Sequence, residues 1–291
     1  MTTPHRFALS LLSLAFASGA FASIGDETAR HMAELYQSTA QSCADAPAFA
    51  CSGILLRTTR PSPHYHTWNN SPNSRKKGGV AFSYLRADAR ISGLAEDARS
   101  GYTLKPVQQR ATGELAYQVL CAYPTDGDSW TRDEAGCGDN SQTDTIEQRC
   151  HQQGIDTAEQ WIAHYQATPG PENKKYFAQC AFDVAKTQGE AAVVAFNEAL
   201  RAMNLLPNPP FPWNEIILQT WDESRSSDLP VQSFFHISGL YGGLQQAQHD
   251  QRDWYETTGK FVPIIEITLP QGEQDAEFRY RADDQAVPEP S

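Results

Sequence analysis

The sequence predicts an α+β fold, with one mostly antiparallel sheet built from both ends of the chain and a helical middle. Apolar runs of strand length lie toward the two ends, and apolar residues at helical spacing fill the middle. Strands and helices that are segregated along a chain favour α+β over alternating α/β folds. We therefore expect a single disulfide-linked domain over residues 23–282 and a flexible polar tail over residues 283–291.

The first 22 residues have the pattern of a secretory signal peptide. His5 and Arg6 precede a short apolar run, and Ala20-Phe21-Ala22 supplies the Ala-x-Ala pattern found before a cleavage site. The apolar run is shorter than the ~20 residues that a membrane span requires. We expect cleavage after Ala22 and export to the periplasm or the extracellular space.

The composition of the 291-residue chain excludes several classes of protein. Its net charge of −12 would repel nucleic-acid phosphates, so a nucleic-acid partner is not expected. With 10% aromatic residues and no fixed repeat, the chain is neither collagen-like nor a coiled coil nor disordered. After the leader, no apolar stretch is long enough to anchor the chain, so no membrane partner is expected either.

Six cysteines follow the leader: Cys43, Cys51, Cys121, Cys137, Cys150 and Cys180. An even number of cysteines in an exported chain predicts three disulfides. A zinc site is disfavoured because the sequence has no Cys-x-x-Cys pair, and no metal is expected. Sequence alone does not fix the pairing. Short loops favour Cys43–Cys51 and Cys137–Cys150, which would leave Cys121 for Cys180.

Helical and apolar patterns place the elements before residue 130. Asp26 can cap a helix whose apolar face extends from Ala29 to Ala40. Apolar runs predict strands over residues 53–57, 80–85 and 117–123. Residues 58–79 are rich in proline, asparagine and glycine, and we expect a long loop there. Long ordered loops in compact domains are often functional.

Helices are expected next, and strands return after Pro230. The patterns Thr157-x-x-Gln160 and Thr187-x-x-Glu190 are capping boxes, each followed by apolar residues at helical spacing. A further helix is predicted over residues 243–258, with Gly259 placed to end it. The late strands are predicted over residues 231–237, 261–269 and 276–280.

Two arginines follow apolar strands and are candidate ligand-binding residues. Arg57 opens the long loop, where a guanidinium can hold a phosphate or carboxylate through two parallel hydrogen bonds. Pairing with a buried acid at the strand end is an equally good interpretation of Arg57. Arg86 follows the strand over residues 80–85 in the same way, and the sequence favours a surface position for it.

The long loop carries an aromatic cluster. Two histidines, His64 and His66, could share a metal, but no third ligand is evident, and polar contacts are the better interpretation. Tyr65 and Trp68 could instead form the wall of a pocket and stack on a planar ring.

Three late carboxylates are candidates for catalysis. Glu266 is the only carboxylate of the strand over residues 261–269. On a solvated face Glu266 would be ordinary, whereas in a cleft its pKa would rise; the pattern slightly favours the solvated face. Asp250 and Asp253 lie in the helix over residues 243–258, where charges near a helix end usually mark a solvated face.

Several segments share a family pattern that spans about Cys43 to Gln285. They are Ala50-Cys51-Ser52-Gly53-Ile54-Leu55-Leu56-Arg57, Tyr65-His66-Thr67-Trp68-Asn69, Gly78-Gly79-Val80-Ala81-Phe82-Ser83-Tyr84-Leu85-Arg86, Ala247-Gln248-His249-Asp250-Gln251, Thr258-Gly259 and Val262-Pro263-Ile264-Ile265. In these segments the chain resembles the halovibrin family, secreted bacterial proteins described as ADP-ribosyltransferases or NAD glycohydrolases.

The resemblance implies an ADP-ribosyltransferase-like fold and an enzyme that consumes NAD as its substrate, without a further cofactor. Enzymes of the Arg–Ser–Glu type place an arginine at the end of the first strand, a serine on the next strand and a carboxylate near a late strand. The residues that occur here in that order are Arg57, Ser83 and one of Asp250, Asp253 or Glu266. Arg57 would then hold the pyrophosphate or ribose side of NAD, and the carboxylate would stabilise an oxocarbenium-like ribose. Further candidates for binding NAD are Tyr65, His66, Trp68 and Arg86.

The chain departs from the Arg–Ser–Glu pattern at two points. The class has Ser-x-Ser where this chain supplies only Ser83, and it has Glu/Gln-x-Glu where the nearest matches are Gln248-x-Asp250 and Gln251-x-Asp253. These departures weigh against transfer to a host or extracellular acceptor protein more than against NAD cleavage. The alternatives are a secreted non-catalytic binding or adhesion module that uses the aromatic loop around Trp68, and another kind of secreted hydrolase.

Overall fold

The computed structural model describes residues 23–40, 43, 49–95, 98–105, 118–127, 149–167, 180–184, 189–206 and 212–290. Within them, nine strands form one sheet in the order β5-β4-β6-β2-β1-β3-β7-β8-β9. The strands are β1 (Ile54–Thr58), β2 (Gly79–Leu85), β3 (Ser100–Leu104), β4 (Val119–Tyr123), β5 (Phe182–Asp183), β6 (Glu215–Gln219), β7 (Val231–Ile237), β8 (Ile264–Thr268) and β9 (Glu277–Tyr280).

The sheet combines early and late parts of the chain. Its central strands β1, β2 and β3 come from the first part, and β6 to β9 flank them on both sides. Neighbouring strands are antiparallel except β7 and β8, which are parallel. This arrangement confirms the predicted α+β class and a mostly antiparallel sheet drawn from both ends of the chain.

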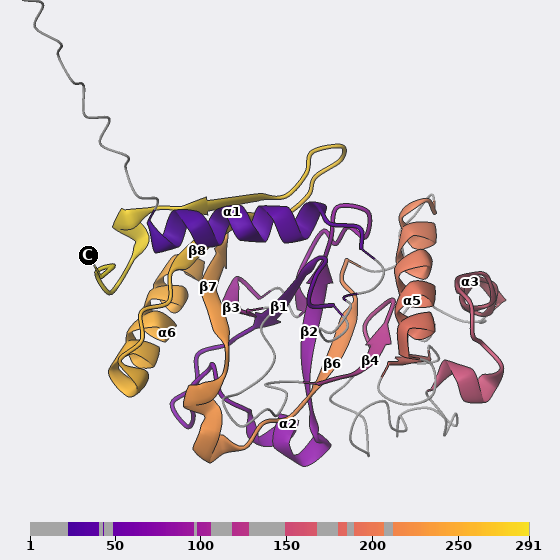
Figure 1. Ribbon diagram of the computed structural model, residues 1–291, viewed down its shortest axis with the longest axis horizontal. Helices are drawn as coiled ribbons and strands as arrows, with labels where there is room; N and C mark the ends of the chain where they lie inside the picture. The colour runs from indigo at the N-terminus through magenta and orange to yellow at the C-terminus, as the bar shows by residue number, and fades with distance from the viewer. Residues whose placement is uncertain are drawn as a thin grey trace, which may run out of the picture.

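Helices cover both faces of the sheet (Figure 1). Helix α1 (Ile24–Gln37) packs through Met32 and Tyr36 against the face formed by Leu56, Phe235 and Ile265. The opposite face is covered by α5 (Gly189–Asn204), on which α3 (Ala158–Ala167) packs, and by α6 (Gly243–Thr258), which connects the parallel strands β7 and β8. The remaining helices are short: α2 (Pro72–Lys77) and the 3₁₀ turns Cys150–Gln153, Glu223–Asp228 and Ala282–Asp284.

Several local predictions are confirmed. Thr157 and Gln160 form the predicted capping box, since Gln160 N donates to Thr157 Oγ1 (3.2 Å) and Thr157 N donates to Gln160 Oε1 (3.1 Å). Gly259 ends α6 in the left-handed conformation. Ser23, rather than the expected Asp26, caps α1, because its hydroxyl accepts the Asp26 amide. Thr187 lies outside the described residues.

Three strands, β3, β5 and β6, were not expected, and the long loop contains the unexpected helix α2. Strand β3 has few apolar residues, and β5 has only two residues, so neither gives a clear pattern. Strand β6 places a short apolar run directly after a polar start. These strands form through pairing with β1, β4 and β2, which a single segment does not encode.

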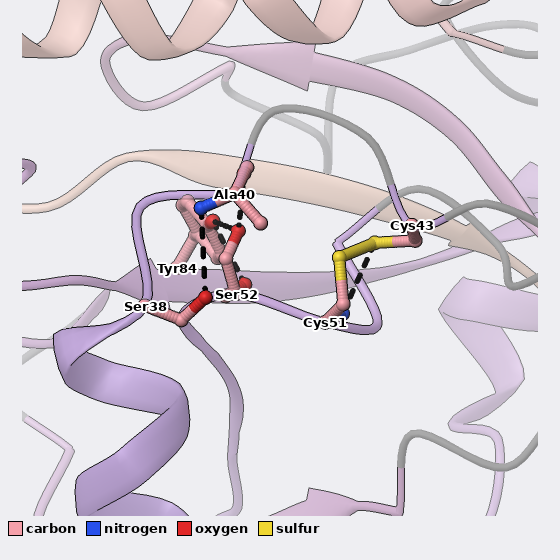
Figure 2. Close-up of a disulfide and its surroundings, with 6 residues drawn as sticks. All are labelled: Ser38, Ala40, Cys43, Cys51, Ser52 and Tyr84. Atoms are coloured by element: carbon pink, nitrogen blue, oxygen red, sulfur yellow. Dashed lines mark hydrogen bonds between the residues drawn. A yellow bond between two sulfur atoms is a disulfide. The ribbon is translucent and has the colours of Figure 1, made fainter.

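The Cys43–Cys51 disulfide confirms one expected pair and lies beside the entry to β1 (Figure 2). Next to it, Ser52 Oγ donates to Ala40 O (3.0 Å), and Tyr84 OH donates to Ser52 O (2.9 Å). Tyr84 is a fully buried residue of β2. These contacts connect the end of α1 to the two central strands and fix where β1 begins.

A second disulfide joins Cys150 to Cys180 and corrects the expected pairs Cys137–Cys150 and Cys121–Cys180. Cys150 N donates to Ala181 O (2.8 Å), so backbone pairing brings the turn at Cys150 beside Cys180. Cys121 is instead buried within β4. Loop length predicts the local pair Cys43–Cys51 but not this second pair, because here backbone pairing decides which cysteines meet. Cys137 lies outside the described residues.

The predicted flexible tail is held against the domain up to its last described residues. Gln251 Oε1 of α6 accepts the amides of Ala286 (2.7 Å) and Val287 (3.2 Å), and Tyr280 OH donates to Glu289 Oε2 (2.7 Å). The expected leader, residues 1–22, lies outside the described residues. None of the helices that the structure describes is long and apolar enough to cross a membrane.

Candidate active site

A cavity of about 260 Å³ lies where the central strands β1 and β2 separate. Over their described lengths, the two strands pair only from Ile54–Leu85 to Leu56–Ser83. Toward its start, β2 continues to pair with β6, while the end of β1 pairs with β3. Beyond Ser83, toward the start of β2, the two described strands are therefore no longer paired with each other. Side chains line the opening between them.

Arg57 reaches across this opening from β1. Its Nη1 donates to the carbonyl oxygen of Ala81 on β2 at 2.8 Å, so the guanidinium joins the two separated strand edges. Arg57 is half-buried and lines the cavity. The alternative interpretation, an ion pair with a buried acid, is not observed in the described part of the chain. A positive group in this position can bind an anionic ligand.

Ser83 and Glu215 line the same cavity from neighbouring strands. The register of β2 with β6 pairs Phe82 with Ile216, so Glu215 follows opposite Ser83. Asn214 fixes this alignment, because its Oδ1 accepts Tyr84 N (2.7 Å) and its Nδ2 donates to Tyr84 O (2.8 Å). The side-chain amide of Asn214 thus extends the pairing of β2 with β6 by one residue, in the way that a backbone amide would.

The carboxylate of Glu215 is held by a close backbone approach. Gly127, in the loop after β4, donates its amide to Glu215 Oε2 at 2.7 Å, and Glu215 is buried. A Cβ atom at position 127 would lie 2.8 Å from that oxygen and 2.6 Å from the Tyr123 ring. Glycine is therefore needed there, and it leaves the carboxylate with a fixed orientation in the cavity wall.

Much of the rest of the wall comes from the long loop and α2 and is polar, while Asp126 after β4 adds a second carboxylate and Phe82, Ala95 and Trp213 add apolar surface. Tyr65 is half-buried and is the cavity-lining aromatic residue of the loop. The other polar residues that line the cavity on this side are Thr58, Thr59, Arg60, Thr67, Asn69, Ser71, Asn73 and Ser74. The cavity thus combines guanidinium, hydroxyl and carboxylate groups with further hydrogen-bonding groups.

Asp250 is buried behind this wall and does not line the cavity. Its Oδ2 accepts Thr59 Oγ1 (3.0 Å), and its Oδ1 accepts Gln246 Nε2 (2.7 Å). Burial raises the pKa of the Asp250 carboxyl, although these hydrogen bonds act to lower it. The expected solvated face is wrong for Asp250, because the helix places this carboxylate between itself and the loop.

Glu266 lies on β8, outside the cavity lining. It accepts hydrogen bonds from Ser238 Oγ (2.8 Å) and Arg281 Nε (3.1 Å). Burial alone would raise its pKa, but the bonds from Ser238 and Arg281 outweigh it, and the pKa of Glu266 lies below its ordinary value. The raised pKa expected for a carboxylate in a cleft is therefore not found.

His66 and Trp68 contact α6 and do not line the cavity. Trp68 Nε1 donates to Asp253 Oδ2 (2.8 Å), and His66 Nδ1 lies 2.7 Å from the same oxygen. Trp68 is only 1% exposed and packs edge-on against Trp254. The prediction that Trp68 stacks on a ligand is corrected by this burial, which also removes it as a contact surface for a binding module.

Arg86 is fully buried, which contradicts the expected surface position. Its guanidinium forms a bidentate pair with Asp88, whose carboxylate also contacts Arg201 of α5. Arg86 does not line the cavity, so this structure gives it a structural partner in place of the predicted ligand. A strand-ending arginine needs an acceptor, and the turn after β2 supplies one two residues later.

Glu215 is the site residue that was missed. The available signal is Trp213-Asn214-Glu215-Ile216-Ile217-Leu218, in which a carboxylate begins a short apolar run. Such a run is consistent with a buried strand, and a carboxylate at its start lies where the strand enters the sheet. In the part of the chain that the structure describes, no group of three or more His, Cys, Asp or Glu could hold a metal ion.

No protein-family model and no curated protein matches this chain. The resemblance to halovibrins stays a prediction, and the function has to be argued from the cavity itself.

Proposed function

We propose that this protein is a secreted NAD glycohydrolase with an ADP-ribosyltransferase-like fold. The observation that carries the proposal is the meeting of Arg57, Ser83 and Glu215 in one cavity, contributed by β1, β2 and β6. An arginine, a serine and a carboxylate are the groups that the Arg–Ser–Glu arrangement requires. The disulfides Cys43–Cys51 and Cys150–Cys180 support export to an oxidising compartment.

The reaction breaks the bond between the ribose C1′ and the nicotinamide nitrogen. The bonding electrons leave with nicotinamide, which becomes neutral, and positive charge develops on the ribose. Glu215 stabilises that charge and then takes a proton from the water whose oxygen bonds to C1′. Arg57 holds the pyrophosphate, and Ser83 orients Glu215 or the ribose through its hydroxyl. Tyr65 replaces Trp68 as the aromatic residue that stacks on nicotinamide.

Hydrolysis fits the site better than transfer to a protein acceptor. The transferase pattern has Glu or Gln two residues before the catalytic Glu, and this chain has Trp213 there. A Glu or Gln side chain can accept a hydrogen bond from an incoming nucleophile, whereas the indole nitrogen of tryptophan only donates. Water, which needs only Glu215 for its activation, is therefore the acceptor that we propose.

The experiment is nicotinamide release from NAD by the purified, oxidised protein. We expect Glu215→Gln to lower kcat at least about 100-fold, because the amide neither stabilises the ribose cation nor accepts a proton. The matched control is Glu266→Gln, which changes the same type of side chain outside the cavity and should keep full activity. A folded Glu215→Gln variant with wild-type turnover would remove Glu215 from the mechanism. Absence of release by the folded wild type from pH 5 to 9 would refute the function.

A further inference from the structure

We propose that Asp250 and Asp253 of α6 are positioning residues that hold the loop over residues 59–68 as a wall of the substrate cavity. This inference rests on the proposed function for its kinetic part. Its structural part, that two carboxylates of one helix hold the two ends of one loop, stands on contacts alone.

The loop forms the wall, whereas α6 does not touch the cavity. The loop residues Thr59, Arg60, Tyr65 and Thr67 line the cavity, and no residue of α6 does. Most of the segment between Thr59 and Thr67 is exposed and lacks regular secondary structure. The conformation of the loop therefore depends on side-chain contacts with the element that it packs on, helix α6.

Each end of the loop is held by one carboxylate. At the first end, Thr59 Oγ1 donates to Asp250 Oδ2 at 3.0 Å. At the second end, Trp68 Nε1 donates to Asp253 Oδ2 at 2.8 Å, and the His66 ring stacks on Trp68 with its Nδ1 2.7 Å from the same oxygen. Residues three apart in a helix share one face, so a single face of α6 holds both ends.

The contact between the loop and α6 contains closely packed indole rings and a buried carboxylate. Trp68 lies against Trp254, with ring centroids 5.0 Å apart, and both indoles are 1% exposed. Asp250 is 0% exposed, its carboxylate accepts hydrogen bonds from Thr59 and Gln246, and its Oδ1 lies 3.4 Å from the ring Nδ1 of His249. Burying a carboxylate costs desolvation free energy, whereas packing alone would need only an apolar residue. What the carboxylate adds is a directional hydrogen bond to a hydroxyl at the cavity.

Asp250 acts through Thr59 and does not reach the reacting atoms. The kinetic consequence is a change in substrate binding more than in the chemical step. We expect Asp250→Ala to raise KM for NAD about 10-fold while kcat changes less than about 3-fold. Asp250→Asn keeps an oxygen that can accept the Thr59 hydroxyl and should stay within about 3-fold of the wild type in both constants.

The test compares these variants with Thr59→Val, Thr59→Ser and Glu256→Gln. Thr59→Val removes the donor and should reproduce the effect of Asp250→Ala, and the double variant should be no worse than either single variant. Thr59→Ser keeps the hydroxyl and should rescue. Glu256 is an exposed carboxylate of the same helix, so Glu256→Gln is the matched control.

Amide hydrogen exchange over residues 59–68 provides a readout that does not need turnover. We expect exchange about 10-fold faster in Asp250→Ala and Thr59→Val, and unchanged in Glu256→Gln. Unchanged exchange and KM in Thr59→Val would overturn the inference even if Asp250→Ala fails to fold. Asp250→Asn as inactive as Asp250→Ala, with a lost limb of the pH profile, would make Asp250 a catalytic acid or base instead. Faster exchange in a protein that does not cleave NAD would refute the function but leave the contact.

Discussion

Arg57 and Arg86 stand in the same sequence context and have opposite surroundings. Each follows an apolar run, one at the end of β1 and the other directly after β2, two strands that are neighbours in the sheet. Arg86 is fully buried, and it pairs with the carboxylate of Asp88 in the turn that follows it. Arg57 is half-buried at the cavity, and its observed acceptor is the neutral carbonyl of Ala81.

The difference shows which strand-ending arginine can bind a ligand. A bidentate pair with a carboxylate satisfies the charge and the planar fork of a guanidinium together. A single bond to a carbonyl fixes one nitrogen and supplies no negative charge to pair with the guanidinium. An arginine of the second kind that lines a cavity can attract the anionic part of a substrate.

The largest effect is expected for activity at Arg57. Arg57→Lys should lower kcat/KM for NAD by about 100-fold, because an ammonium cannot reproduce the planar fork. The thermal unfolding midpoint should stay within about 2 °C, since only one hydrogen bond to a carbonyl changes. Initial rates of nicotinamide release and a thermal melt of the same sample provide the measurement. A variant with full activity would place Arg57 among structural residues like Arg86.

At Arg86 we expect a substitution to lower stability and to leave activity unchanged. Arg86→Met should lower the free energy of unfolding by about 3 kcal/mol, because it removes the buried partner of Asp88. The specific activity of the folded fraction should not change, since Arg86 lies outside the cavity lining. Urea unfolding at pH 7, combined with rates corrected for the folded fraction, tests both statements. A stable but inactive variant would contradict the assignment.

The smallest effect concerns the pH dependence of the Arg86 site. Burial alone would raise the pKa of Asp88, but bonds from Arg86 and Arg201 outweigh it, and its pKa lies below the ordinary value. Its stabilisation is therefore present above pH ~4 and is lost as the pH falls through the lowered pKa. Asp88→Asn should cost about 1.5 kcal/mol at pH 7 and less at pH 3, because part of the contribution is lost once the pH is below the pKa of the unfolded chain. Equal losses at both pH values would exclude an ionised Asp88 as the cause.

Local patterns predicted β1, β2, α6 and the capping box of α3, because each depends on residues close in sequence. The site depends on contacts between distant segments. Glu215 reaches Ser83 only through the pairing of β6 with β2, and the helical charges that suggested a solvated face include a fully buried Asp250. Arg57 was open to two interpretations because its acceptor lies on another strand. Burial of a polar residue is a tertiary property, and sequence periodicity alone did not indicate it here.

The contact of the last residues with the first helix sets an order of assembly. The amide of Ile24, at the start of α1, donates to the side chain of Glu289, and Tyr280 OH holds the same carboxylate. A chain that emerges from the ribosome presents α1 before Glu289, which follows hundreds of residues later. The start of α1 therefore gains this partner only when synthesis has passed residue 289. The domain is therefore completed only when its last residues are available to fold.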